Sequence, residues 1–396
     1  MEKRKFRFLR MPIGSDLTIF VCTITLALFG LVMSVSAGMT YATVDLNPLV
    51  MATIRHFAFF LISYFFMYVA ASLFNFNLAR KLLFIIVITT AIALLLPLLF
   101  DPVNGAHRWI RIMNFTIQPS EFAKVVMIVL IAIYLGDLKV TKRKGWDIVK
   151  APFFILCIYG AIILFLQNDF GTALVIGAIA VICFLVPSNR CIRGFQRLVM
   201  AGTAVLVPLI VFLMSNRGIE FIRQTGLIRP WRLARIEMAG NPFTDRFNTG
   251  YQLVNSLIAF SNGGWFGVGL GRSIQKYGYL PEARTDFILA IIVEELGFVG
   301  AMFIFILYAF LIYRLFYYAF KIESEKGKIV LIGTAMYLFI HLVFNVGGVI
   351  GLIPLTGIPL LLISSGGSST MAVFLAIGIC QAVISKYNRE KLESAR

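Results

Sequence analysis

Residues 82–100 read LLFIIVITTAIALLLPLLF, a run without a single charged side chain. A helix of about 20 such residues crosses the ~30 Å hydrocarbon core of a bilayer. The rest of the chain has the same character, because 59% of its 396 residues are apolar, only 14% are charged, and the mean hydropathy is +0.88. Soluble domains have about 45–50% apolar and about 25% charged residues. The sequence therefore predicts an all-α, polytopic membrane protein.

Similar apolar runs recur along the chain and predict about ten transmembrane helices. We expect them at 17–37, 54–74, 82–100, 121–136, 151–167, 170–187, 198–214, 286–320, 328–350 and 368–385. As one helix, the run 286–320 would be about 50 Å long at ~1.5 Å per residue. We therefore expect it to tilt, to break near Gly297 or Gly300, or to project beyond the membrane. The basic N-terminus leads into a long apolar stretch without an evident cleavage site, so we expect a retained first span rather than a signal peptide.

Lysine and arginine fix the expected orientation, because basic loops stay in the cytoplasm. With the N-terminus inside, the inner segments hold 23 Lys and Arg and the outer segments hold 11. Both termini are therefore expected in the cytoplasm, and residues 215–285 form a large extracytoplasmic loop between spans seven and eight. We expect residues 1–396 to form one integral membrane domain. On such a protein the net charge of +17 does not indicate a nucleic-acid partner.

The large outer loop is itself basic, with nine Arg and Lys against four acidic residues in 215–284. It is either a solvated loop that touches lipid headgroups or a cradle for an anionic substrate. Within it, GYQLVNSLIAF at 250–260 has apolar residues at helical spacing and predicts a helix at, or dipping into, the membrane interface. The glycine-rich SNGGWFGVGLGRS at 261–273 lacks the spacing of a nucleotide-binding loop and predicts a flexible re-entrant turn.

Ionisable side chains at membrane depth are costly, so each needs a partner or a function. Glu121 and Lys124 lie three residues apart on one face of the fourth span. They can neutralise each other as a structural pair, or they can face a substrate. Asp169 can cap the helix that follows it by accepting from the amides of Gly171 or Thr172.

Asp286 ends the basic loop and opens the eighth span. As a helix cap it would need no substrate. It also lies beside Arg284 and Glu282 where a cationic loop meets the membrane, and a carboxylate there can act as a general base. A divalent cation, Mg or Mn, could bridge Asp286 to a diphosphate, although no residue pattern indicates one. Glu294 and Glu295 lie about 12–14 Å deeper on a regular helix, too far for a paired-carboxylate site, so we expect them to bond to neighbouring spans.

The last outer turn, NVGGVIGLIPLTGIPLLLISSGGSSTM at 345–371, is rich in glycine, proline and serine. Irregular backbone at this depth is tolerated only where it is buried in protein or lines a cavity. The serine hydroxyls, including that of Ser368, and the free amides could bind phosphate, or the segment is a tight packed turn. His56, His107 and His341 lie on separate segments, and we expect packing or interfacial roles for them rather than a metal centre.

Six segments together are similar to the SEDS family (shape, elongation, division and sporulation), whose members include FtsW and RodA. They are GAHRWI at 105–110, QPSEFAK at 118–124, DFGTA at 169–173, GYQLVNSLIA at 250–259, LPEARTDFILAIIVEELG at 280–297, and GLIPLTGIPL with SSGGSS at 351–369. They occur in the order of the family and cover most of the chain. GYQLVNSLIAF and GVGLG are more similar to the FtsW branch than to the RodA branch.

The resemblance implies a peptidoglycan glycosyltransferase of the bacterial plasma membrane that polymerises lipid II, the undecaprenyl-diphosphate-linked disaccharide peptide. For the FtsW branch it implies septal wall synthesis during cell division, with a class B penicillin-binding protein and other division proteins as partners. The essential aspartate of the family maps onto Asp286, and its QPD-type aspartate maps onto Asp169. The glutamate and lysine of its QPSEFAK motif map onto Glu121 and Lys124, which would line the central cavity.

The implied reaction agrees with the chemistry of the residues. Asp286 would take the proton of the attacking sugar hydroxyl, and cationic groups would stabilise the departing diphosphate. The candidates for binding substrate are Arg108, Arg284, Arg232 and Arg235, besides Glu121, Lys124, Asp169 and Ser368. The family often has His at the position of Arg284, which argues against a histidine proton relay there.

Two other classes of protein remain open. A transporter could flip lipid II across the membrane, but transporters often contain inverted repeats, and none is evident. A scaffold could only recruit division proteins, but it would need no charged cavity and would keep working without Asp286.

Overall fold

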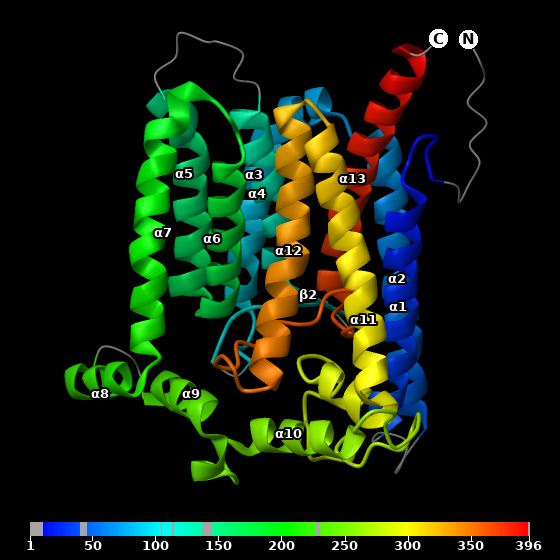
Figure 1. Cartoon of the computed structure of the whole chain (residues 1–396), viewed down its shortest axis with the longest axis vertical. Coiled ribbons are helices and arrows are strands. Elements are labelled where there is room, and N and C mark those ends of the chain that lie inside the picture. The colour runs from blue at the N-terminus through cyan, green and yellow to red at the C-terminus, as the bar shows by residue number, and fades with distance from the viewer. Residues whose placement is uncertain are drawn as a thin grey trace.

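The computed structural model describes residues 11–39, 46–103, 105–112, 115–136, 145–226 and 230–394. Long helices run side by side along one direction (Figure 1). They are α1 (Leu17–Ala37), α2 (Asn47–Leu73), α3 (Phe76–Leu95), α4 (Pro119–Leu135), α5 (Gly145–Ala161), α6 (Phe170–Leu185), α7 (Arg193–Leu213), α11 (Ile288–Lys321), α12 (Glu325–Val349) and α13 (Gly367–Ser394). Short helical turns follow α3 (η2, Leu96–Leu99) and α5 (η3, Ile162–Leu166) and precede α7 (η4, Arg190–Ile192).

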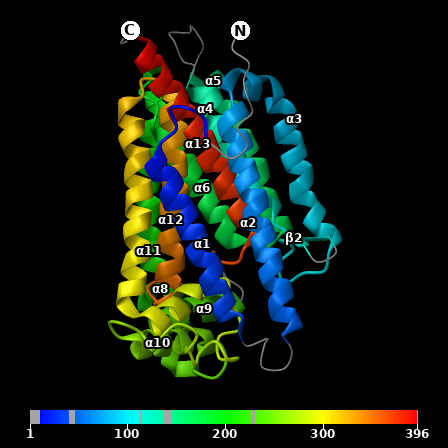
Figure 2. The same ribbon diagram turned by 90° about the vertical axis from the view of Figure 1, so that its right-hand side faces the viewer.

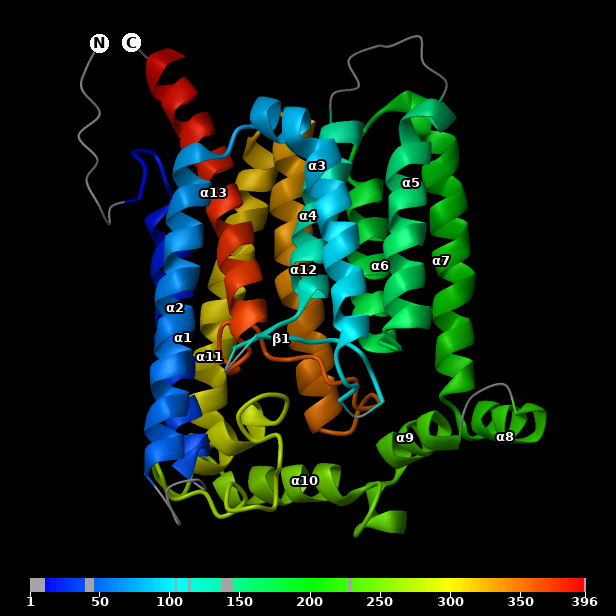
Figure 3. The ribbon, with the colours of Figure 1, turned by 180° about the vertical axis from the view of Figure 1, so that it is seen from behind.

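Within the described ranges, eight of these helices are long and apolar enough to cross a membrane, namely α1, α2, α3, α5, α7, α11, α12 and α13. Helices α4 and α6 are shorter, with 17 and 16 residues, and lie inside the same bundle (Figure 3). The expected helical membrane fold is confirmed. Each expected span has a corresponding helix, and a count of ten full crossings stays a prediction.

One short hairpin departs from the all-α expectation. Strand β1 (Ile110–Ile112) pairs antiparallel with β2 (Phe115–Ile117), with Ile110 opposite Ile117. The hairpin carries the chain from α3 into α4 at the end of the bundle far from the termini (Figure 3). Two strands of three residues gave no alternating pattern long enough to be recognised in the sequence.

The chain enters α1 and leaves α13 at the same end of the bundle. Helices α8 (Asn216–Thr225), α9 (Pro230–Gly240) and α10 (Tyr251–Gly263), with the turn η5 (Pro242–Asp245), lie across the opposite end (Figure 1). The large loop is therefore on the side away from the termini, as the sequence predicted. Helix α10 corresponds to the helix expected at 250–260. The identity of the cytoplasmic end stays a prediction from the charge count.

The centre of the bundle is formed by α4, α12 and α13, whereas α3 and α7 lie at its rim (Figures 2 and 3). Nearly every residue of α4 is buried, and α13 packs along α2 while α12 packs against α11, α4 and α6. Helix α7 instead exposes Val205, Leu206, Val207 and Val211. Apolar side chains exposed in this way are solvated by lipid, so the rim is the lipid-facing surface.

The longest helix, α11, breaks at Gly297, which has φ 69° and ψ −167°. A break leaves backbone amides and carbonyls without their partners in the helix. Each such group at membrane depth costs on the order of several kcal/mol unless it finds another hydrogen-bond partner. The loop after α10 supplies the partners. The amides of Val268 and Gly269 donate to the carbonyls of Glu294 and Glu295, both at 2.9 Å.

The other side of the break is satisfied by the same loop. The amides of Phe298 and Val299 donate to the carbonyls of Gly264, at 2.9 Å, and Trp265, at 3.1 Å. The expected break near Gly297 or Gly300 therefore occurs at Gly297, and the glycine-rich turn at 261–273 is the segment that fills it.

We expect Gly267→Ala to destabilise the protein more than Gly278→Ala. Both glycines have positive φ, 77° and 91°, which costs an L-residue about 1–2 kcal/mol. A Cβ on Gly267 would overlap the carbonyl of Glu295, whereas a Cβ on Gly278 would have no atom within 4 Å. The overlap should cost about 1–3 kcal/mol more. Apparent unfolding temperatures in lipid nanodiscs compare the two variants, and equal temperatures would contradict the close approach at Gly267.

Candidate functional site

The backbone around Asp286 is held by the last outer turn and by α12. Three successive carbonyls, those of residues 284–286, each accept a hydrogen bond. Ser365 donates to the first through its hydroxyl at 2.9 Å and its amide at 3.0 Å. Ser364 donates to the second through its hydroxyl at 2.7 Å, and Asn345 donates to the third through its side-chain amide at 2.8 Å. The position of Asp286 is therefore fixed through its main chain.

The clamping groups are themselves fixed. Asn345 also donates to the carbonyl of Ile358 at 3.0 Å, and the Ser364 hydroxyl accepts from the amide of Leu360 at 2.9 Å. Ser364 and Ser365 thus use their hydroxyls to hold backbone in a packed turn. Ser368 is buried in the first turn of α13.

The side chain of Asp286 is not a helix cap, so that alternative is wrong. The N-cap residue of α11 is Phe287, and no side chain bonds to the helix start. Among the described residues, no hydrogen bond reaches the half-buried Asp286 carboxylate. Its Oδ2 and the Nη1 of Arg108 lie 3.5 and 3.6 Å from the position that a Cβ on Gly357 would take. The carboxylate and the guanidinium therefore meet at this glycine.

Arg108 is shared between two carboxylates. Its Nε lies 3.3 Å from Oδ2 of buried Asp169. Asp169 is the N-cap of α6, and it accepts from the amide and the hydroxyl of Thr172 at 3.1 and 2.8 Å, which confirms the expected cap. The side-chain amide of Gln118 approaches the same carboxylate at 3.5 Å. Asp169 thus holds Arg108 from one side, and Asp286 lies on the other.

The pKa of Asp286 is raised from 3.8 to about 6. Burial is the main cause, because it disfavours the charged form, and the negative charge of Glu282 acts in the same direction. The positive charges of Arg108 and Arg235 lower the pKa to a smaller extent. A carboxylate with this pKa can accept a proton near neutral pH and release it again.

The other arginine candidates lie at different distances from Asp286. Arg235, on α9, is near enough to act on it electrostatically. The Cζ of Arg284 lies 3.4 Å from the position of a Cβ on Gly38, at the end of α1, so its guanidinium is directed toward α1. Arg232 is also on α9, and its side chain lies outside the described residues.

Glu121 and Lys124 form a second polar cluster, buried between α4 and α12. Lys124 Nζ lies 2.7 Å from Glu121 Oε1 and 2.9 Å from His341 Nε2, and the Tyr337 hydroxyl donates to Glu121 Oε2 at 2.9 Å. A lysine ammonium only donates, so Nε2 accepts and Nδ1 of His341 donates to the Pro359 carbonyl at 3.2 Å. The cluster therefore bonds to the turn that contains Gly357.

Three residues of α12 were not assigned to the site from the sequence. Tyr337 and Asn345 were not singled out, and His341 was expected in a packing or interfacial role. They are spaced four residues apart, so they share one face of the helix. Three polar side chains at that spacing on an otherwise apolar span are the signal that would have indicated this face.

No group of three His, Cys, Asp or Glu side chains that could hold a metal ion occurs among the described residues. The charged groups that act on Asp286 are the cationic Arg108 and Arg235 and the acidic Glu282. This arrangement suits an anionic ligand together with a group that loses a proton.

The fold and site define a polytopic helical membrane protein with a carboxylate and an arginine at the end of the bundle away from its termini. A family model described as "Cell cycle protein", of the FtsW, RodA and SpoVE proteins, matches residues 16–390. The chain belongs to this family, which is the one expected from the six sequence motifs.

Curated relatives cover most of the chain. The probable peptidoglycan glycosyltransferase FtsW of Bacillus subtilis (strain 168) is 38% identical over 77% of this chain and 74% of that protein. A protein of the same description from Francisella salina is 33% identical over 96% of this chain and 91% of its own length. Stage V sporulation protein E of Bacillus subtilis is 32% identical over 94% of this chain and 98% of its own length. The enzyme class expected from the sequence is thus the one that the FtsW relatives carry in their names.

Solved structures share the fold. One chain, from a structure described as "Structural coordination of polymerization and crosslinking by a peptidoglycan synthase complex", is similar with a TM-score of 0.71 at 21% identity, covering 94% of this chain and 98% of that chain. The rod shape determining protein RodA of Thermus thermophilus is similar with a TM-score of 0.63 at 21% identity, covering 93% of this chain and 96% of that chain.

We expect Lys124→Met to lower stability strongly, by about 3–5 kcal/mol, because it leaves the carboxylate of Glu121 buried without a cation. The two side chains are only 1% and 2% exposed, so water cannot compensate. The double variant Glu121→Gln, Lys124→Met should recover most of the loss. Apparent unfolding temperatures in nanodiscs measure both, and a double variant less stable than Lys124→Met would contradict a self-compensating pair.

Proposed function

We propose that this protein is a peptidoglycan glycosyltransferase that polymerises lipid II during septal wall synthesis. The observation that carries the proposal is the Asp286 carboxylate, fixed through its backbone, without hydrogen bonds from the described residues, and adjacent to Arg108. Membership of the family and the names of the curated FtsW relatives support the reaction class.

In the proposed reaction, a 4-hydroxyl of the acceptor sugar attacks the anomeric carbon of the donor. The new C–O bond forms as the bond from that carbon to the polyprenyl diphosphate breaks, and the diphosphate leaves with the electron pair. Asp286, as a carboxylate, takes the hydroxyl proton. A base without other hydrogen bonds is available to that proton, and the three bonded carbonyls keep it in place.

The departing diphosphate gains negative charge, which fixed cations stabilise. Arg108 is the cation adjacent to Asp286, and Asp169 orients it. Arg235 contributes to the same field. We assign Glu121 and Lys124 a supporting role, because their cluster bonds to Pro359 in the turn around Gly357.

The proposal includes a class B penicillin-binding protein as the crosslinking partner and the division septum as the site of action. Support for the partner comes from the similar solved structure, which is described as a complex that coordinates polymerisation and crosslinking. A divalent cation, Mg or Mn, that bridges Asp286 to the diphosphate stays a prediction from the sequence, and the steps above are written with the side chains of this chain alone.

We expect the purified protein, with its cognate penicillin-binding protein, to form glycan strands from fluorescent lipid II, and Asp286→Asn to reduce the rate by about 10²–10⁴ because the base is lost. Asp245→Asn is the matched control. Asp245 is a half-buried carboxylate of the same loop, bonded only within its own turn, and its variant should keep normal activity.

Gel analysis of the strands distinguishes the alternatives. Equal amounts of strands from the native chain and from Asp286→Asn would mean that another residue acts as the base. No strands from any chain, combined with lipid II transfer across vesicles, would favour a flippase. The absence of both strand formation and lipid II transfer would favour a scaffold.

We also expect the polymerisation rate to fall as the pH is lowered through about 6. The raised pKa of Asp286 means that its carboxylate is protonated below this value and cannot act as a base, so the rate at pH 5 should be about one tenth of its plateau. Glu282→Gln removes a charge that raises the pKa and should move the midpoint to lower pH. A rate that is constant between pH 5 and pH 7 would contradict this role.

A further inference from the structure

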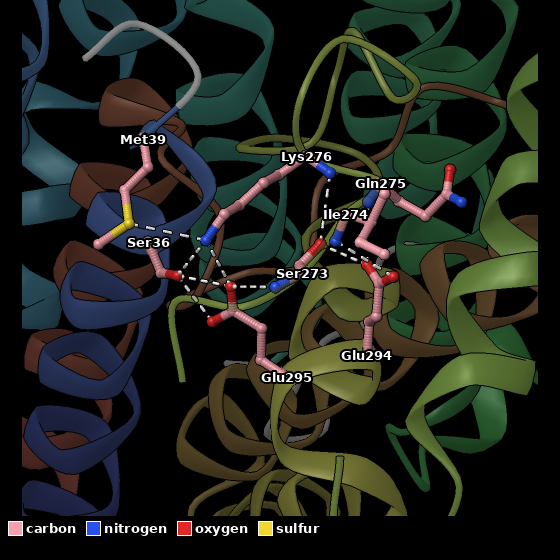
Figure 4. A network of polar contacts seen from close by, with 8 residues as sticks. All are labelled: Ser36, Met39, Ser273, Ile274, Gln275, Lys276, Glu294 and Glu295. Atoms are coloured by element: carbon pink, nitrogen blue, oxygen red, sulfur yellow. Dashed lines mark hydrogen bonds and ion pairs between the residues drawn. The ribbon is translucent and has the colours of Figure 1, made fainter. Parts of the chain in front are cut away.

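A fully buried ion pair lies near the same end of the bundle, and the proposed reaction makes no use of it. Lys276 Nζ is 2.8 Å from Glu295 Oε1, and both side chains are 0% exposed. The hydroxyl of Ser36, on α1, donates to both oxygens of Glu295 at 2.7 and 2.6 Å (Figure 4). Lys276 Nζ also lies 3.3 Å from Ser36 Oγ and 3.6 Å from the sulfur of Met39.

The adjacent carboxylate, Glu294, binds the loop rather than a neighbouring span, so the expectation for it was wrong. It accepts from the hydroxyl of Ser273 and from the amides of Gln275 and Ile274 at 3.2 and 3.4 Å (Figure 4). The side-chain amide of Asn262 donates to it as well, at 3.2 Å. The Ser273 amide approaches Glu295 Oε1 at 3.4 Å. The two glutamates thus bind segment 273–276 through both its side chains and its backbone.

The ion pair closes a loop that contains Asp286. Lys276 and Glu295 are 19 residues apart, and Asp286 lies midway between them. Between Lys276 and Asp286, backbone hydrogen bonds join successive turns. The amide of Leu280 donates to the carbonyl of Gln275 at 3.0 Å, and the amide of Ala283 donates to the carbonyl of Leu280 at 3.1 Å. On the other side, the first turns of α11 lead from Phe287 to Glu295.

Burying two charges has a large desolvation cost, which offsets much of their attraction, so the ion pair adds little net stability to the fold. Removing either partner leaves an uncompensated charge in a dry environment. The ion pair instead joins the two ends of the loop, because Lys276 at one end is the only described cation in contact with Glu295 at the other. Such a contact holds the loop in one arrangement.

We propose that the Lys276–Glu295 ion pair, anchored to α1 by Ser36, is a latch that closes segment 276–295 and positions Asp286 against Arg108. Lys276 and Glu295 are positioning residues, since neither touches the reacting groups. The catalytic part of this inference rests on the proposed function, whereas the closure of the loop does not.

The test compares Lys276→Met, Glu295→Gln and the double variant in the full chain in nanodiscs. Each single variant should lower kcat for strand formation at least tenfold, change KM less than threefold, and shift the pH midpoint of the rate. The loss of kcat in the double variant should be no greater than in either single variant, because the two side chains act as one unit. A loss in the double variant equal to the product of the two single losses would mean independent effects and would overturn the latch.

Hydrogen exchange gives a readout that needs no activity. In the single variants, the amides of Leu280, Ala283 and Phe287 should exchange at least tenfold faster than in the native chain. Unchanged exchange would overturn the latch even if activity were lost. If the native chain makes no strands, the proposed function fails, while the exchange measurement still decides whether the loop is closed by the ion pair.

Arg314→Met is the matched control, because Arg314 pairs with Asp16 at the other end of α11. It should lower the unfolding temperature without changing the pH midpoint or the exchange of 277–287. If it changes both, the effects are ones of general stability and the latch is wrong. Should the single variants fail to fold, Ser36→Ala, which keeps the ion pair and removes its anchor, must still accelerate the same exchange, and no acceleration would overturn the inference.

Discussion

The arrangement at the end of the bundle away from the termini depends on one constraint, the need of every buried backbone group for a hydrogen-bond partner inside the protein. Two segments that are not regular helix bond to neighbouring stretches of the chain there, the glycine-rich loop after α10 and the last outer turn. The first fills the break in α11 at Gly297, and the second bonds to the three carbonyls at 284–286. Satisfying the backbone therefore also fixes the main-chain position of Asp286.

The same constraint separates the roles of the two carboxylates on either side of Arg108. Asp169 accepts from the amide and hydroxyl of Thr172, so its charge is compensated and it acts as a cap and an anchor. Asp286 accepts no hydrogen bond from the described residues and has a raised pKa. Environments that differ in this way are a common basis for giving two similar acids different functions.

Features that depend on neighbours in sequence could be predicted from the residues. The apolar runs indicated the helices, and the spacing at Asp169 indicated its cap. The length of 286–320 indicated a tilt, a break near Gly297 or Gly300, or a projection beyond the membrane, and the break at Gly297 is the one that occurs. Contacts between distant segments could not be predicted, because a single sequence does not show which helix faces meet. Lys124 and His341 are 217 residues apart, and Ser36 and Glu295 are 259 apart. Their charges at membrane depth and their three-residue spacing drew attention to Glu121 and Lys124, but nothing in the sequence paired them with α12.

The most direct test of the account is an experimental structure of the Asp286→Asn variant with lipid II bound in the donor and acceptor positions. If Asp286 is the base, the 4-hydroxyl of the acceptor sugar should lie within about 3 Å of the side chain at position 286, or one water away, with the diphosphate of the donor against Arg108. A substrate whose reacting sugars lie at the opposite end of the bundle, or whose diphosphate lies away from Arg108, would contradict it.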